Sequence, residues 1–148
     1  MPAKLLLASL SGAAVLCAFS DLTGGQLKLL QDPGGWEYLK MTDSGMQTEH
    51  ACFDGKLHPD TCSGRLTLSP DNKFVQEVSI RGQRVPRHGT YSLEGDQLTF
   101  LDELETPDGP YTIEVDSEKK SLLMYTAQVR IELILQKALR DKKRKDAK

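Results

Sequence analysis

The sequence predicts an all-β fold, an antiparallel up-and-down barrel of about eight short strands. Over residues 64–136, short segments of alternating apolar and polar residues are separated by turn residues, a spacing typical of sandwiches and barrels. No long helical segment lies between them, so the strands should pair in sequence and antiparallel. The clearest unit is a hairpin over 89–100, whose apolar residues share one face before and after a Glu-Gly-Asp turn.

Residues 1–20 have the features of a secretory signal peptide. Lys4 supplies the positive charge, the apolar stretch that follows is too short for a membrane span, and Ala18-Phe19-Ser20 offers a small-x-small cleavage site. The mature chain is therefore predicted to begin at Asp21, to be exported to the periplasm or secreted, and not to stay inserted in a membrane. A lipid anchor at Cys17 and a retained anchor helix are the alternatives.

The mature chain begins with a weakly apolar lead-in that ends at the breaker Asp32-Pro33-Gly34-Gly35. A first strand is predicted over 36–41, with Trp36 and Tyr38 on one face and Leu39 and Met41 on the other. The stretch 42–64 has little periodicity and reads as a long loop, which is usually functional or cross-linked.

The later strands follow from period-two alternation. Residues 65–69 and 73–81 are predicted strands, and Gln76 is the one polar residue on the inward face of the second. After the 89–100 hairpin, 106–110 reads as a turn and 111–116 as a strand. Residues 122–135 contain neither Gly nor Pro, and their alternation favours strand over helix.

Two motifs carry a resemblance to a known family. Gly34-Gly35-Trp36 forms G-x-W on the first strand, and the strand ladder after it includes Gly-Thr-Tyr-Ser-Leu-Glu-Gly-Asp-Gln-Leu-Thr-Phe over 89–100. This arrangement resembles the small lipocalin-like domains of secreted bacterial proteins, in the wider calycin group, over about 34–136. The resemblance implies a barrel domain over 21–136 whose base is closed by Trp36. Members of the family bind small apolar molecules, inhibit other proteins or have no known role.

The segment 50–62 holds the one cluster with site-like spacing. Cys52 and Cys62 are the two cysteines of the mature chain, and export to an oxidising compartment favours a disulfide between them. The alternative is a tetrahedral zinc or soft-copper site formed by His50, Cys52, His58 and Cys62, which would make the protein a metal-binding envelope protein.

The leading functional hypothesis is a non-catalytic exported barrel that binds either a small apolar ligand or an envelope protein. For the second partner, the contact surface would be the 42–64 loop. The sequence suggests no cofactor, and we expect a monomer. The candidate ligand-binding residues on inward faces are Trp36, Phe74, Gln76, Tyr91, Phe100 and Tyr111.

Charge and motif content argue against two other classes of function. The body 21–136 carries 11 basic and 19 acidic residues, a net charge of −8, whereas the C-terminal tail 137–148 carries +5. An acidic body is not typical of a nucleic-acid-binding domain, and the tail is predicted to be a solvated, frayed helix or disordered. No nucleophile motif or phosphate loop is found, so we expect no catalytic residues and no enzyme.

Overall fold

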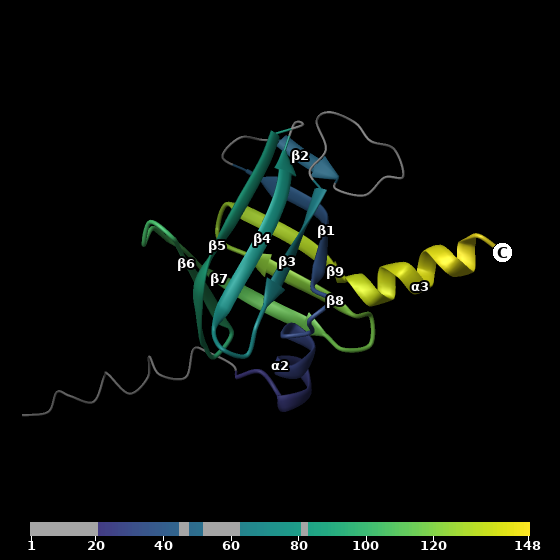
Figure 1. Ribbon diagram of the computed structural model, residues 1–148, viewed down its shortest axis with the longest axis horizontal. Helices are drawn as coiled ribbons and strands as arrows, with labels where there is room; N and C mark the ends of the chain where they lie inside the picture. The colour runs from purple at the N-terminus through teal and green to yellow at the C-terminus, as the bar shows by residue number, and fades with distance from the viewer. Residues whose placement is uncertain (1–20, 45–47, 52–62, 81–82) are drawn as a thin grey trace, which may run out of the picture.

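The computed structural model describes residues 21–44, 48–51, 63–80 and 83–148, and its strands form a closed antiparallel barrel (Figure 1). The barrel strands are β1 (Trp36–Asp43), β3 (Ser63–Leu68), β4 (Lys73–Ile80), β5 (Gln83–Glu94), β6 (Gln97–Asp102), β7 (Pro107–Asp116), β8 (Ser121–Tyr125) and β9 (Val129–Leu135). Each strand pairs with its neighbour in sequence, and β1 pairs with β9 to close the ring. The predicted eight-stranded up-and-down barrel is confirmed.

A further strand, β2 (Thr48–Ala51), pairs antiparallel with the last half of β1. Strand β2, the end of β1 and the start of β3 fall within the stretch 42–64, which the sequence predicted as loop, so the prediction was wrong for these residues. We call the barrel end near Trp36 the base and the end near Asp43 the upper end.

The base is closed by helix α2 (Gly24–Leu30), which the sequence did not predict. Thr23 and Gln26 form a capping box at its N-terminus, which satisfies otherwise unpaired backbone N–H groups. The Trp36 indole N–H donates to the Leu30 carbonyl at 3.0 Å, and the Gln26 side chain donates to the Val115 carbonyl at 3.0 Å. A helix of this length is marginal alone, so these contacts with the barrel hold it in place.

The hydrophobic core fills the base and the middle of the barrel. Phe74 and Phe100 meet edge to face with ring centroids 4.9 Å apart. The buried apolar residues are Leu30, Trp36, Tyr38, Leu66, Leu68, Phe74, Val78, Tyr91, Leu98, Phe100, Ile113, Val115, Leu122, Met124, Ile131, Leu133 and Leu135.

A β-bulge in β1 changes the predicted faces of the first strand. The register with β9 shifts between Tyr38 and Lys40, so Leu39 is the extra residue. Met41 then faces inward and packs against the core, whereas strict alternation placed it on the outer face.

Two predicted boundaries on the C-terminal side were also wrong. Strand β7 begins at Pro107, so the turn lies at 103–106 rather than 106–110. The predicted strand 122–135 is two strands, because the Thr126 hydroxyl accepts hydrogen bonds from the N–H groups of Gln128 and Val129 and turns the chain.

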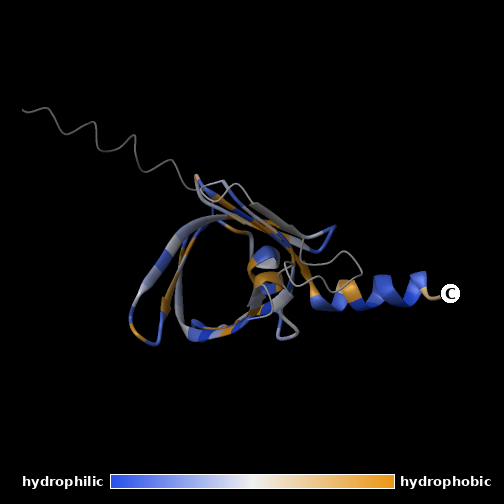
Figure 2. Cartoon of the chain, turned by 90° about the horizontal axis from the view of Figure 1, so that it is seen from above, coloured by the Kyte–Doolittle hydropathy of each residue, from blue (hydrophilic) through white to orange (hydrophobic). Residues whose placement is uncertain are grey.

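The basic tail forms helix α3 (Gln136–Asp146), which projects away from the barrel (Figures 1 and 2). Gln136 is buried and Ala138 packs against the core, while the residues from Arg140 onward are exposed. Within the described ranges, no helix is both long and apolar enough to span a membrane.

Candidate ligand site

The inward-facing residues of the barrel become more exposed from the base to the upper end. On β5, Tyr91 is 5 % exposed, whereas the Arg87 side chain, four residues closer to the upper end, is 29 % exposed. Val85 pairs with Val78 of the core and faces the same side, yet it is 44 % exposed. The base is therefore packed, and on β5 the inward positions nearer the upper end, Arg87 and Val85, are partly exposed.

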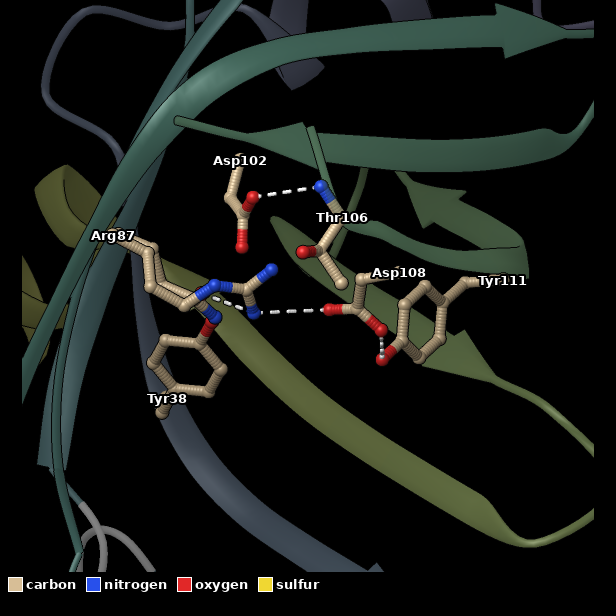
Figure 3. A network of polar contacts seen from close by, with 7 residues as sticks. Tyr38, Arg87, Asp102, Thr106, Asp108 and Tyr111 are labelled. Atoms are coloured by element: carbon tan, nitrogen blue, oxygen red, sulfur yellow. Dashed lines mark hydrogen bonds and ion pairs between the residues drawn. The ribbon is translucent and has the colours of Figure 1, made fainter. Parts of the chain in front are cut away.

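Five side chains form a polar network on the inner wall of the barrel (Figure 3). Arg87 Nη1 donates to Gln76 Oε1 at 3.3 Å and to Asp108 Oδ2 at 3.0 Å. The Gln76 amide donates in turn to the Tyr38 hydroxyl. The Tyr111 hydroxyl donates to Asp108 Oδ1 at 2.6 Å. We call these five residues the interior network.

Strand register explains why these side chains meet. Gln76 and Arg87 lie directly opposite each other on β4 and β5, so their side chains project to the same side. On β7, Asp108 pairs with Phe100 whereas Tyr111 pairs with Leu98, a register shift that gives β7 one extra residue. Both Asp108 and Tyr111 therefore point inward.

The extra residue is accommodated at Gly109. Its φ of 120° lies in a region that favours glycine, and a Cβ there would lie 2.9 Å from the Leu98 carbonyl oxygen. A glycine at this position thus allows the bulge that aims Asp108 at Arg87.

The two tyrosines of the network are held as neutral hydrogen-bonding groups. Burial raises the pKa of Tyr38 to about 12. Burial, followed by its hydrogen bond to Asp108, also raises the pKa of Tyr111. Both hydroxyls therefore keep their protons near neutral pH, while Arg87 and Asp108 form an ion pair with side chains about one third exposed.

Asp102 places a second carboxylate beside the network. It pairs with Gly89, two residues from Arg87 on the same face of β5, and Figure 3 shows its carboxylate pointing toward the guanidinium. Its Oδ1 accepts hydrogen bonds from the N–H groups of Leu104 and Thr106, both at 2.9 Å. These bonds fix the carboxylate at the end of β6.

The candidate residues named from the sequence separate into two groups. Gln76 and Tyr111 belong to the interior network. The aromatic residues Trp36, Phe74, Tyr91 and Phe100 are buried in the core, and the Tyr91 hydroxyl is already bonded to the Ser69 carbonyl and the Gln31 amide.

Sequence reasoning missed Arg87 and Asp108 and did not assign Tyr38 to the site. Arg87 could have been found, because steps of two residues back from inward-facing Tyr91 lead through Gly89 to Arg87. Asp108 could not be placed this way, because the Pro- and Gly-rich segment around it is typical of a turn.

The cysteine and histidine cluster lies almost entirely outside the described residues. Cys52, His58 and Cys62 are not described, and His50 belongs to β2, of which only the backbone is described. Among residues 21–44, 48–51, 63–80 and 83–148, no three His, Cys, Asp or Glu side chains gather as metal ligands would. The disulfide and the metal site both remain predictions, and so does the signal peptide over 1–20.

A groove of about 680 Å³ lies between β7, β8 and β9 and is lined by Leu39, Glu114, Leu123, Arg130 and Glu132, among others. Glu114, Leu123 and Glu132 are opposite one another across these strands on the face away from the core, and the groove is bordered by charges of both signs. We place the candidate site in the barrel interior, because polar groups from β1, β4, β5 and β7 converge there among apolar core residues.

Comparisons with protein-family models, with curated proteins and with solved structures found no match to this chain.

Proposed function

We propose that the protein is an exported, non-catalytic, lipocalin-like domain that binds a small apolar ligand in the upper half of its barrel. The observation that carries the proposal is the interior network, a few polar groups that converge inside the barrel, of which Arg87 and Asp108 are about one third exposed. Ligand sites commonly combine an apolar lining with a few placed polar groups that orient the guest.

The surroundings of the network support an apolar guest. Around and above it, apolar inward positions are occupied by Met41, Val78, Val85, Phe100 and Val129, and Asp43 lies opposite Val129 at the upper end. The packed base and α2 close the lower end of the barrel, so the proposed ligand site lies toward the upper end.

The chemistry of the network supports binding rather than catalysis. A general acid or base works best when its pKa lies near the working pH. The raised pKa values of Tyr38 and Tyr111 move both hydroxyls further from neutrality, and the guanidinium of Arg87 does not lose its proton in proteins.

A matched pair of bulky substitutions tests the proposal. Val85→Trp should obstruct the upper interior, while Val75→Trp places the same side chain on the outer face of β4, where Val75 is 53 % exposed. A fluorescent apolar probe should bind the exported protein saturably. We expect Val85→Trp to weaken binding by about tenfold, as overpacking costs roughly 1–3 kcal/mol, and Val75→Trp to leave it unchanged.

Failure to bind any member of a broad panel of apolar probes would reject the carrier function. The alternative for the chain is then an envelope-protein partner that contacts the 42–64 segment, or a metal held by the cysteines and histidines of 50–62.

A further inference from the structure

From the hydrogen-bonding groups of the interior network, we infer that the polar end of the ligand is a neutral hydrogen-bond acceptor, such as the carbonyl of an ester, amide or ketone, rather than a free carboxylate. This inference rests on the proposed carrier function and names the chemical class of its ligand.

Arg87 has more N–H donors than the interior network uses. A guanidinium carries five N–H groups, and those of Nη1 point to Gln76 and Asp108. Nε and Nη2 donate to none of the described residues, although the Asp102 carboxylate points toward the guanidinium. Because the side chain is 29 % exposed, a guest that enters from the upper end can reach these groups.

Tyr38 supplies a second donor, deeper in the barrel. The residue is fully buried, and its hydroxyl oxygen accepts from the Gln76 amide. No described residue accepts the hydroxyl proton. A buried donor without a partner is costly. Because Tyr38 is fully buried, a guest reaches this hydroxyl only by displacing the side chains that cover it, and accepting its proton then offsets part of that cost.

The charges of the site determine which acceptor fits. The positive charge of Arg87 is already balanced by Asp108 at 3.0 Å, and Asp102 adds a further negative charge beside it. A carboxylate guest would leave three negative charges facing one guanidinium in a partly desolvated space, which is unfavourable. A carbonyl oxygen accepts the same hydrogen bonds and brings no charge.

Three ligands with similar chains separate these contributions: methyl laurate, laurate at about pH 8, where its carboxyl group is ionised, and dodecane. Binding to the exported full chain is measured by displacement of a fluorescent apolar probe. We expect methyl laurate to bind at least about tenfold more tightly than laurate, the cost of an uncompensated charge.

Single substitutions show whether the network is responsible. Tyr38→Phe should weaken the binding of methyl laurate by about three- to tenfold, the range for the loss of one hydrogen bond. The affinity for dodecane should stay unchanged. Asp102→Asn should raise the affinity for laurate by about fivefold, as expected for removing a nearby like charge. The affinity for methyl laurate should stay the same. Tyr91→Phe, which removes a hydroxyl from the closed base, is the matched control and should change none of the three affinities.

The inference is overturned if laurate binds as tightly as its ester, if Tyr38→Phe leaves ester binding unchanged, or if Asp102→Asn does not improve laurate binding. If none of the three ligands binds the wild-type protein, dodecane included, the proposed carrier function is rejected. The inference about the ligand, which rests on that function, is then rejected as well.

Discussion

Trp36 joins the N-terminal helix to the barrel wall. Its side chain is fully buried, and its indole N–H donates to the Leu30 carbonyl. We expect Trp36→Ala to lower the free energy of unfolding by about 3–5 kcal/mol, typical for truncating a buried tryptophan. Trp36→Phe keeps most of the apolar area and should cost about 1–3 kcal/mol through the lost hydrogen bond. Urea unfolding of both variants measures the difference, and near-neutral results would show that the base does not depend on this side chain.

Tyr38 makes the stability of the protein sensitive to alkaline pH. Its pKa in the folded state is raised by burial to about 12, against 10.0 for an exposed tyrosine. Its contribution to stability is therefore fully present below about pH 10 and is lost as the pH rises toward 12, up to about 3 kcal/mol. Urea unfolding measured from pH 9 to about pH 12 should show a shallower decline for Tyr38→Phe than for the wild type. Equal slopes would contradict this account.

At the scale of residues, the sequence could predict whether a side chain faces the barrel interior only where the alternation of the strand is unbroken. Gln76 could be placed inside the barrel because β4 is regular from Phe74 to Val78. Asp108 could not, because its orientation results from the bulge at Gly109 and from pairing with β6. The polar site is thus assembled by tertiary pairing that local patterns do not contain.

The contacts of helix α3 with the barrel core that the structure describes lie in its first turn. The Gln136 N–H donates to the Gly35 carbonyl at 2.9 Å, and Ala138 packs against the core. Removing 141–148 should change the free energy of unfolding by less than about 0.5 kcal/mol, as for exposed positions. Removing 136–148 also takes away the anchoring hydrogen bond and should cost about 1–3 kcal/mol. A large effect of the shorter deletion would show that the distal helix packs on the barrel.

At the scale of elements, the sequence indicated most strands correctly but not their irregularities. Period-two patterns record only which side chains are apolar. They do not encode the register shift at Leu39 or the turn at Thr126, which is made by hydrogen bonds to the Thr126 hydroxyl. Helix α2 was not predicted because its short segment has little apolar periodicity of its own. It is held instead by Trp36 and Val115.

The closed barrel links the two ends of the domain. Strand β1 pairs with β9 along its length, from Trp36 opposite Leu135 to Asp43 opposite Val129. These are the first and the last strands of the barrel, so the pairing depends on contacts distant in sequence. Folding should therefore be slow for a domain of this size, in the range of about milliseconds to seconds.

Closure also predicts that the barrel and its base unfold together. Since β1 carries both Trp36 and the pairing with β9, neither can be lost alone, and unfolding should be a single transition. Far-UV circular dichroism reports the whole sheet and Trp36 fluorescence reports the base, so the two urea curves should coincide. Leu133→Ala, at a fully buried position of β9, should move both curves together by about 2–5 kcal/mol. A fluorescence change at lower urea than the loss of sheet would mean that α2 and Trp36 leave the barrel first, and the base would then be a separate, weaker unit.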